Sequence, residues 1–375
     1  MKNYDLDNFE PAAKIVVIGV GGAGNNAVNR MIDEEISDVT FYVANTDKQA
    51  LSTSKASNRI ILGEEITGGL GAGGEPEVGA AAAEASADTI REIVKDANMV
   101  FVAAGMGGGT GTGAAPVIAR IAKDAGALVV AIVTRPFTFE GAKRTVHSID
   151  GLNKLKANVD SIIVVSNDKL LMTSGNAPIS QAFNESDNVL AQSVKTVVNL
   201  ILLPAVINLD FADVRNTLTN SGVSLIGFGM GSGANRAKEA ADNAINSPLL
   251  EASISGARRA IVAVTCGPNV SLYDAQDTVN LLINASGNDI DLKFGVAIND
   301  QLNDEILVSV IASDFKEEID FSKPTNLNRF AGATQPKETV PVQNNILDQE
   351  EPTPAPTKEG DIDLSDILGN FLKDN

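Results

Sequence analysis

The sequence predicts an α/β protein: a Rossmann-like, mostly parallel sheet, then a long helix and a smaller α/β region. Three observations predict it. Short β-branched runs alternate with longer helical patterns through the first half of the chain, and glycine-rich turns stand between them. The apolar residues, 44% of the 375, are almost all aliphatic because aromatic residues make up only 4%. Such alternation is typical of parallel sheets with helices on both faces.

The expected elements of the first half follow in order. Six short runs rich in Val and Ile are expected strands, at residues 14–19, 39–44, 59–62, 99–103, 127–133 and 160–166. Between them, helical patterns cover residues 76–96, 113–123 and 141–155. In sheets of this kind ligands bind at the carboxyl ends of the strands, which is where the glycine-rich turns fall.

The second half begins with a long helical pattern that ends at Pro204, which cannot continue a helix. Beyond it, strands expected at 223–230, 258–266, 292–298 and 305–312 alternate with helices expected at 235–245 and 272–285. This predicts a second, smaller α/β unit whose sheet faces the long helix. The predicted divisions up to this point are a flexible arm (1–11), a first domain (12–178), a central helix (179–203) and a C-terminal domain (204–317).

The composition changes after the last expected strand. Residues 323–360 hold 6 of the 14 Pro and show almost no periodicity, which predicts a disordered linker over 318–360. Residues 361–375 then carry an apolar helical stripe, formed by Leu364, Ile367, Leu368, Phe371 and Leu372. The stripe is either a frayed end or a partner-binding peptide. We favour the second, because on its acidic tether it has nothing of its own to pack against.

Charge and cysteine content exclude several classes. The net charge of −19 repels nucleic acid and anionic lipid, so neither is an expected direct partner. The longest aliphatic stretch, 197–207, is far shorter than the ~20 residues of a membrane-spanning helix, and the polar start does not resemble a signal peptide. The single Cys, Cys266, lies in an apolar run and is expected to be buried. Without a second Cys no disulfide forms within the chain, which suits the cytoplasm.

The first glycine-rich turn is Gly19-Val-Gly21-Gly22-Ala23-Gly24, between an expected strand and a helix. Taken alone, it fits the GxGxxG fingerprint of dinucleotide-binding proteins, and Asp47 stands roughly where the ribose-binding acid is expected. An NAD-dependent dehydrogenase is therefore one alternative. Turns of this kind bind many phosphates through free backbone N–H groups and the helix dipole, so the first turn does not decide the ligand.

The second turn, Gly105-Met-Gly107-Gly-Gly109-Thr-Gly111-Thr-Gly113, is more specific. Consecutive N–H groups that no side chain covers form an anion-binding nest, and the Thr hydroxyls add donors. A dehydrogenase needs only one phosphate loop, so a second loop predicts a nucleoside triphosphate. No GxxxxGK[ST] motif occurs in the sequence, which excludes a Walker-type NTPase.

These residues also carry a resemblance to a known family. The run of Gly and Thr at 107–113 matches the FtsZ form of the tubulin-superfamily glycine motif, and the similarity covers about residues 12–317. Further matching motifs follow in family order: Asn45-Thr-Asp47, Gly69-Leu-Gly-Ala-Gly73, Arg135-Pro-Phe-Thr-Phe-Glu-Gly141, Asn167-Asp168, Asn208-Leu-Asp-Phe-Ala-Asp213 and Ser247-Pro-Leu-Leu-Glu251. The sequence is identified as a member of the FtsZ family of tubulin-like GTPases.

The resemblance implies that the first domain is a GTP-binding domain. It assigns the phosphates to Gly21, Gly22, Ala23, Gly24, Asn25 and Asn26, and to Gly105, Gly107, Gly108, Gly109, Thr110, Gly111, Thr112 and Gly113. It places Ala72 and Gly73 near the γ-phosphate, Thr134, Pro136, Glu140 and Arg144 at the ribose, and Asn167, Phe183 and Asp187 at the guanine. Mg²⁺ is implied only through GTP or GDP, because no Cys, His and Asp cluster has metal-site spacing.

The chemistry agrees with the guanine-binding roles. Phe183 offers a stacking face, and Asp187 can accept from the N1–H and 2-amino groups of guanine, a donor pair that adenine lacks. The two residues are four apart on the expected long helix and so share a face. Two neighbouring positions depart from the family pattern: Gly74 stands where the family commonly has Ala, which only adds backbone freedom, and Glu75 stands where it commonly has Asn. Glu75 puts a negative charge near a triphosphate, unless it points away or helps to hold Mg²⁺.

The segment 208–213 opens an expected helix. By itself, Asp210 is a plausible N-cap. The resemblance instead implies a catalytic loop that enters the next subunit's site, where Asp210 and Asp213 polarise a water or bind a cation and Asn208 contacts the γ-phosphate. Hydrolysis then depends on head-to-tail assembly.

The resemblance finally implies a biological role. It implies a homopolymer that forms the contractile division ring in the cytoplasm, at midcell beneath the membrane. Phe371-Leu-Lys373 fits the ending of the family's C-terminal peptide, although the usual Asp-Ile-Pro start is absent. Implied partners of this peptide are membrane adaptors of the FtsA or SepF kind. The alternative is a tubulin-like filament GTPase without a role in division.

Overall fold

The computed structural model describes residues 13–173, 178–202, 205–250, 252–287 and 290–316. The arm, the linker and the C-terminal peptide with its apolar stripe lie outside the described residues. So do Leu203 and Pro204, at the predicted end of the long helix.

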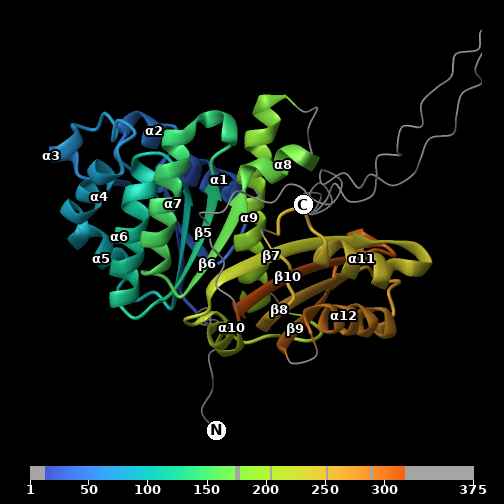
Figure 1. Cartoon of the computed structure of the whole chain (residues 1–375). Helices are drawn as coiled ribbons and strands as arrows, with labels where there is room; N and C mark the ends of the chain where they lie inside the picture. Colours follow the sequence, from blue (N-terminus) through green and yellow to red (C-terminus); the bar gives the residue numbers. More distant parts are fainter. Residues whose placement is uncertain (1–12, 174–177, 203–204, 251, 288–289, 317–375) are drawn as a thin grey trace, which may run out of the picture.

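The fold is built on ten strands whose order is β3-β2-β1-β4-β5-β6-β7-β10-β8-β9 (Figure 1). The neighbours from β3 to β7 are parallel, as are β8 and β9, whereas β10 is antiparallel to both β7 and β8. The strands are β1 (Ile15–Val20), β2 (Val39–Asn45), β3 (Asn58–Ile61), β4 (Met99–Gly105), β5 (Leu128–Arg135), β6 (Ser161–Ser166), β7 (Gly222–Gly231), β8 (Ala257–Cys266), β9 (Asp291–Ile298) and β10 (Ile306–Phe315). The predicted mostly parallel sheet is confirmed.

The helices connect these strands. The α-helices are α1 (Gly21–Asp33), α2 (Lys48–Ser52), α3 (Glu64–Thr67), α4 (Pro76–Ala85), α5 (Ala87–Val94), α6 (Thr110–Asp124), α7 (Ala142–Lys156), α8 (Asn167–Thr173), α9 (Ile179–Leu202), α10 (Phe211–Leu218), α11 (Arg236–Ile245) and α12 (Leu272–Ser286). The described residues also form the short 3₁₀ turns η2 (Thr138–Glu140), η3 (Gly233–Asn235) and η4 (Asp300–Leu302).

Strand β1 shows why the parallel strands read as continuous apolar runs. Ile15 and Val17 pack on one face of the sheet, in a cluster with α1 and α9. Val16, Ile18 and Val20 pack on the other face, in a cluster with α5, α6 and α7. Because both faces are covered by helices, every residue of the strand is buried and no polar alternation is needed.

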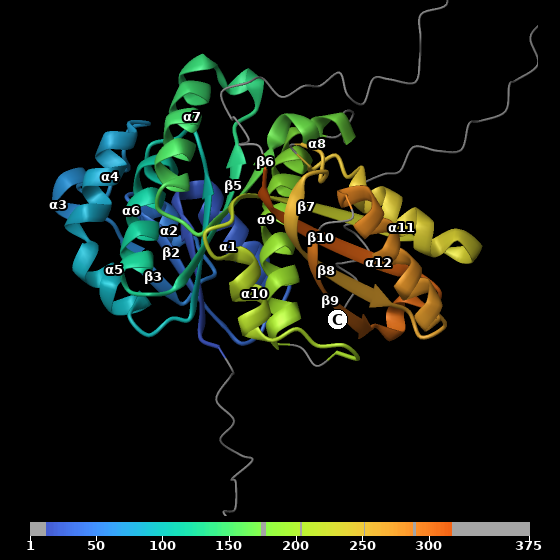
Figure 2. The ribbon, with the colours of Figure 1, turned by 60° about the horizontal axis from the view of Figure 1, so that its bottom comes forward.

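Helix α9 lies in the middle of the molecule, as Figure 2 shows. Its Val194 shares one buried cluster with Val17 of the first sheet region and with Phe228 and Ile261 of the C-terminal strands. The predicted packing of the second sheet against the long helix is thus confirmed. The other face of these C-terminal strands is covered by α11 and α12.

Two features differ from the predicted elements. The helix expected at 76–96 is broken at Ser86, whose hydroxyl accepts a hydrogen bond of 2.9 Å from the Gly63 backbone N–H. The two sheet regions are also not separate, because Ile163 of β6 is in register with Ser224 of β7. Both features depend on partners distant in sequence, which a periodic pattern does not encode.

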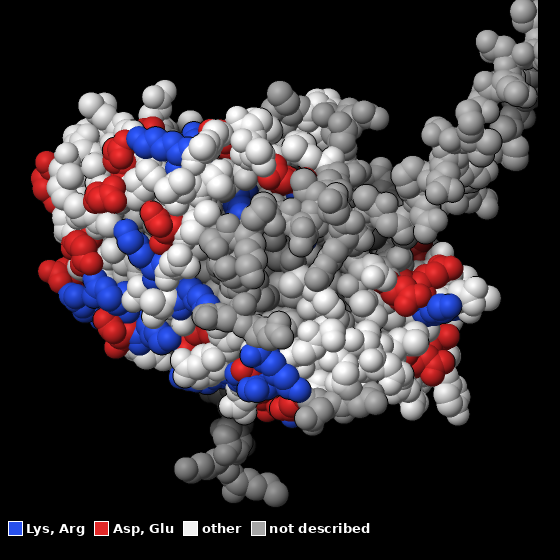
Figure 3. Space-filling model, viewed as in Figure 1, with Lys and Arg blue, Asp and Glu red and all other residues white. Residues whose placement is uncertain are grey.

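The surface over α4 to α7 mixes the two charge signs. Figure 3 shows basic and acidic side chains side by side on this part of the face. One ion pair joins two of these helices: Arg120 of α6 lies 2.6 Å from Glu84 of α4. Cys266 is buried as predicted, and burial raises the pKa of its thiol to about 11, so the sulfur stays protonated at neutral pH.

Candidate functional site

The candidate site begins where two helices start without caps. Helix α1 follows Val20 and helix α6 follows Gly109; neither preceding residue makes a side-chain capping bond, and neither first turn holds an acid. The first N–H groups of a helix have no partner within it and carry the positive end of its dipole. Both helix starts can therefore bind an anion through backbone groups.

The two glycine loops touch each other. Gly21 has a φ of +71°, and a Cβ there would lie 2.9 Å from the backbone nitrogen of Gly111. On the inner side, a Cβ on Gly24 would lie 2.3 Å from the carbonyl oxygen of Ala103. The loops that were assigned to phosphates are thus one continuous surface, and close backbone packing explains several of their glycines.

Other glycines in the predicted phosphate set have no such neighbours. Cβ atoms on Gly22, Gly73 and Gly108 would meet nothing within 4 Å. Each comes from a different loop, and the backbone at each has open space beside it; we call these three positions the open glycine surface. A phosphate chain fits this arrangement, because only bare backbone lets its oxygens approach consecutive N–H groups.

The two predicted phosphate-binding asparagines are placed differently. Asn25 is only 3% exposed; in the amide orientation that satisfies both of its polar atoms, its nitrogen donates to the carbonyls of Gly21 (2.9 Å) and Gly19 (3.0 Å), and its oxygen accepts from Asn45 Nδ2 (3.2 Å). It therefore braces the first loop from within. Asn26 is exposed.

Thr46, a residue without a predicted role, joins the remaining loops. Its hydroxyl and that of Thr110 are 2.7 Å apart, and its carbonyl accepts from the Gly71 N–H at 3.1 Å. Thr46 is fully buried. The signal was present in the Asn45-Thr-Asp47 motif, whose Asp47 side chain caps α2 by accepting from Gln49 and Ala50.

The predicted ribose residues gather at Gly107. A Cβ on Gly107 would lie 2.9 Å from the Arg144 carbonyl oxygen and 3.2 Å from Pro136 Cγ. Glu140 forms an ion pair with Arg144 and accepts from the Phe137 N–H at 2.9 Å. Thr134 is buried on the neighbouring strand β5.

The predicted base-binding residues come from α8 and α9. Phe183 remains 41% exposed and forms a T-shaped contact with the Phe137 ring, with 5.0 Å between centroids. Phe137 in turn stacks on Phe139 at 4.9 Å. Asn167 is buried and accepts from the Ser186 hydroxyl at 2.8 Å. Phe137 thus connects the predicted ribose residues to the predicted base-binding residues. The sequence carries no signal for this role, because the burial of Phe137 depends on packing in the fold.

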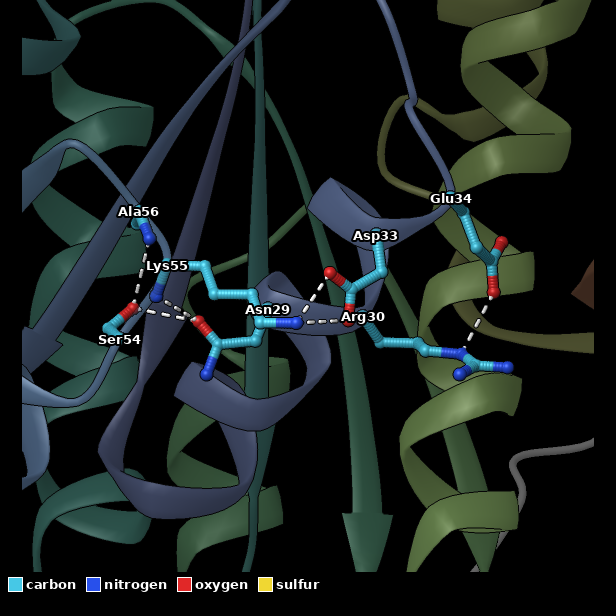
Figure 4. Close-up of polar contacts among 7 residues, drawn as sticks. All are labelled: Asn29, Arg30, Asp33, Glu34, Ser54, Lys55 and Ala56. Carbon is cyan, nitrogen blue, oxygen red and sulfur yellow. Dashed lines mark hydrogen bonds and ion pairs between the residues drawn. The ribbon is translucent and has the colours of Figure 1, made fainter. Parts of the chain in front are cut away.

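Asp187 is the most perturbed acid of the predicted set. Burial raises the pKa of its carboxyl to about 7, and the positive charge of Arg30 on α1 opposes that rise. Asp187 is half-buried, and a partly desolvated carboxylate without a full set of partners is prepared to accept donors from a ligand. Arg30 also lies 3.3 Å from Glu34 (Figure 4).

The segment 54–56 holds α1 from one side. Asn29 Oδ1 accepts from the Ser54 hydroxyl at 2.9 Å and from the Lys55 N–H at 2.8 Å, and the Lys55 ammonium lies 2.6 Å from Asp33 (Figure 4). These contacts fix the helix whose first turn belongs to the candidate site.

The predicted catalytic trio lies at the far end of the molecule. Helix α10 is at the bottom of Figure 1, whereas α2 and α8, which follow β2 and β6, are at the top with the carboxyl ends of the strands. Asp210 caps α10 by accepting from the Asp213 N–H at 2.8 Å, so the capping interpretation is confirmed. Asn208 accepts from the Ala205 N–H at 2.6 Å. One chain does not bring this trio to its own glycine loops.

Two family models match most of the described chain. Residues 14–175 match the Tubulin/FtsZ family, GTPase domain, and residues 222–316 match the FtsZ family, C-terminal domain. An FtsZ from M. jannaschii, described as an empty dimer, is 38% identical, with 88% of this chain and 95% of that chain covered and a TM-score of 0.79. The chain belongs to the Tubulin/FtsZ family.

Membership of the Tubulin/FtsZ family implies guanine-nucleotide binding and, in general, GTP hydrolysis. A tryptophan-to-tyrosine mutant of M. jannaschii FtsZ is 40% identical, covering 82% of this chain and 93% of that one with a TM-score of 0.79. CetZ2 from Haloferax volcanii, described as a GTPgS-bound protofilament, shares the fold at 22% identity and a TM-score of 0.69, with coverage of 82% and 95%.

The family assignment overturns the dehydrogenase alternative. The structure adds a physical reason, because Asp47, the proposed ribose-binding acid, uses its carboxylate to cap α2. Within the described ranges, no group of three His, Cys, Asp or Glu side chains is placed to hold a metal. No helix in the described part of the chain is long and apolar enough to cross a membrane.

Proposed function

We propose that this chain binds and hydrolyses GTP and polymerises head to tail, with the catalytic loop of one subunit completing the nucleotide site of the next. One observation carries the proposal: the open glycine surface and the Asn208, Asp210 and Asp213 loop lie at opposite ends of the molecule. An interface between unlike ends repeats along an axis and builds a filament.

In this proposal, the N–H groups at Gly22, Gly73 and Gly108 bind the phosphates, because their surface is open. Phe183 stacks on the guanine, and ionised Asp187 accepts its N1–H and 2-amino donors. Mg²⁺, held through the phosphates, supplies charge neutralisation when bound. The CetZ2 and FtsZ neighbours, described with GTPgS in a protofilament and as a dimer, support nucleotide binding and assembly.

The catalytic step falls to exposed groups of the neighbour. Asp210 keeps its backbone-capping bond through one carboxylate oxygen, which leaves the other for water or a cation. Asp213, half-buried beside it, and Asn208 complete a set that can orient an attacking water in line with the γ-phosphate. Hydrolysis is then coupled to assembly.

Exposed apolar side chains at both ends support a contact there. Leu70 (88% exposed) and Phe139 (64%) flank the open glycine surface. Val206 (64%) and Ile298 (59%) lie beside the Asn208 loop. Large apolar side chains exposed in this way mark interaction surfaces when they gather near functional loops.

Sedimentation with GTP, GDP or ATP, alongside phosphate release, tests the proposal. Pelleting and phosphate release are expected with GTP and not with ATP. Pelleting that did not depend on the nucleotide would contradict the proposal.

Mixing two inactive variants distinguishes a site shared between subunits from a site formed by a single chain. Asp213→Ala and Asp187→Ala are each expected to be inactive, and a mixture is expected to recover part of the activity, because the intact loop of one serves the intact nucleotide site of the other.

We place the filament, as part of the same proposal, in the division ring at midcell beneath the membrane. The implied connection is the C-terminal peptide 361–375, which would bind an adaptor of the FtsA or SepF kind through Leu364, Ile367, Leu368, Phe371 and Leu372. A tubulin-like filament without a division role is the second candidate, favoured by the shared fold with CetZ2. A fluorescent fusion that forms midcell bands, and division that fails on depletion, would decide for the first.

A further inference from the structure

Glu75, where the chain departs from the family pattern, has a specific partner. Its carboxylate lies 2.6 Å from the ammonium of Lys143. Glu75 precedes α4 and does not use its side chain to cap that helix. Lys143 belongs to the first turn of α7. The carboxylate therefore points across to another helix.

The pair joins the two walls of the second glycine loop. On one side, a Cβ on Gly109 would lie 2.9 Å from the Glu75 nitrogen. On the other side, a Cβ on Gly107 would lie 2.9 Å from the carbonyl oxygen of Arg144, the residue after Lys143. The backbone of Glu75 and that of the α7 start thus both border the loop, and the ion pair bridges them.

The position of this charge matters for a bound triphosphate. Hydrogen bonding and the charge of Lys143, with a smaller contribution from His147, hold the pKa of Glu75 below its usual value, so the carboxylate is ionised. A carboxylate without a neutralising partner near the phosphate loop repels an anionic ligand, and the repulsion grows with the charge of that ligand. GTP carries more charge than GDP, at the end predicted to lie near Ala72 and Gly73.

The pair has little to do for the fold itself. The Lys143 side chain is 69% exposed and that of Glu75 is 49% exposed. Exposed ion pairs contribute little to folding stability. We therefore expect the ion pair to affect nucleotide affinity, because Lys143 determines whether the charge of Glu75 is neutralised.

Resting on the proposed function, we propose that Lys143 is a positioning residue for the γ-phosphate: by holding and neutralising Glu75 beside the second glycine loop, it sets the preference of the site for GTP over GDP. Lys143 acts through Glu75. Lys143 is then a determinant of which nucleotide the same site prefers.

The test is a double-mutant cycle with Lys143→Gln, Glu75→Gln and the double variant. The Kd of each is measured for GDP and for a slowly hydrolysed GTP analogue, at protein concentrations below assembly. We expect Lys143→Gln to weaken binding of the GTP analogue about fivefold and that of GDP less than about twofold. The double variant is expected to recover the wild-type ratio, because the unneutralised carboxylate is gone. Lys95→Gln, which breaks an exposed ion pair with Glu92 on α5, is the matched control and is expected to change neither Kd.

Equal weakening of both ligands by Lys143→Gln, or a double variant as impaired as the single one, overturns the proposal. If Lys143→Gln fails to fold, Glu75→Gln still tests the proposal. Glu75→Gln is expected to bind the GTP analogue at least as tightly as wild type. If it binds the GTP analogue more weakly than wild type while its affinity for GDP is unchanged, the proposal is overturned. A wild-type chain that binds no guanine nucleotide refutes the proposed function itself, a result distinct from either outcome.

Discussion

Thr46 and Thr110 share a hydrogen bond of 2.7 Å between their hydroxyl groups, although 64 residues separate them in the chain. Thr46 is fully buried behind the loop that carries Gly71, and Thr110 starts α6. Because the Thr46 carbonyl also accepts from the Gly71 N–H, Thr46 ties the β2–α2 connection, the loop that carries Gly71 and the second glycine loop into one unit. The candidate site is preorganised by polar contacts that lie beneath its surface.

Thr46→Val is expected to lower stability by about 1–2 kcal/mol, because it removes a buried hydroxyl bond while keeping the shape of the side chain. Guanine-nucleotide affinity is expected to fall as well, since the loops lose their common brace. Denaturant unfolding and nucleotide titration measure the two effects. Thr53→Val is the control: that hydroxyl is exposed and bonds only to the Ala50 carbonyl. Equal stability of the two variants would contradict the bracing role.

Two alanine substitutions separate ligand-facing from packing glycines. Gly22→Ala adds a Cβ into open space, so we expect near-normal stability with nucleotide affinity lowered about tenfold or more, since the methyl group occupies the phosphate surface. Gly24→Ala puts a Cβ 2.3 Å from the Ala103 oxygen, and we expect a stability loss of about 2–3 kcal/mol. Thermal unfolding and titration of both proteins check this. Undiminished affinity in Gly22→Ala would remove that loop surface from the phosphate site.

The difference between Gly22 and Gly24 could not be predicted from the sequence. The strand and helix order was predictable because strands covered on both faces, such as β1, are unbroken apolar runs, and because glycine clusters punctuate them. The family motifs then named the site positions. They did not tell which glycines face open space, because that depends on contacts between loops such as Gly21 and Gly111.

Partners distant in sequence account for the other differences. The Ser86 break between α4 and α5 depends on Gly63, and the insertion of β10 between β7 and β8 depends on strand pairing. Hydrophobic periodicity indicates an element's type and its buried face but not its neighbour. For the same reason, Asp187 was named as a base-binding residue from the motif, while its burial and its raised pKa required the packed structure.

Asp187 predicts a pH dependence of guanine binding. Its pKa is raised to about 7, so below pH 7 the side chain is mostly protonated and cannot accept both guanine donors. We expect affinity to fall as pH decreases, by up to about tenfold per unit below pH 7, and binding at pH 6.5 to release a proton. Calorimetric titrations in buffers of different ionisation enthalpy measure both. Asp187→Asn is expected to bind weakly at every pH; if it kept the wild-type profile, another group would be responsible.

The raised pKa of Asp187 also determines how the stability of the ligand-free protein depends on pH. The folded pKa of Asp187 lies above its ordinary value of 3.8, so the folded state holds this proton more tightly. The contribution of Asp187 to stability is fully present below that ordinary value and decreases as pH rises to about 7. Urea midpoints of wild type and Asp187→Asn are expected to converge at the acidic end of this window and to diverge toward neutral pH.

Two neighbouring acids at the C-terminal end of α1 give the last prediction: Asp33 is its last residue and Glu34 its C-cap. Glu34, with a side chain 5% exposed, accepts from Gln192 at 2.7 Å and lies 3.3 Å from Arg30 and 3.8 Å from Lys195. Burial raises its pKa despite both cations, so desolvation is the larger effect. Glu34→Ala is expected to cost about 2 kcal/mol, because it leaves Gln192 and the cations without this partner at the α1–α9 contact.

Asp33→Ala is the matched control, one residue away. Asp33 pairs with Lys55 at 2.6 Å, but the side chains are 43% and 53% exposed, and such pairs contribute about 0–1 kcal/mol. Glu34→Gln should destabilise less than Glu34→Ala, since its amide oxygen can still accept from Gln192 and the desolvation cost of the buried carboxylate is removed. Denaturant unfolding of the three variants gives the order. Equal losses for Glu34→Ala and Asp33→Ala would show that burial does not distinguish these two pairs, and that α1 is held to α9 by apolar packing rather than through Glu34.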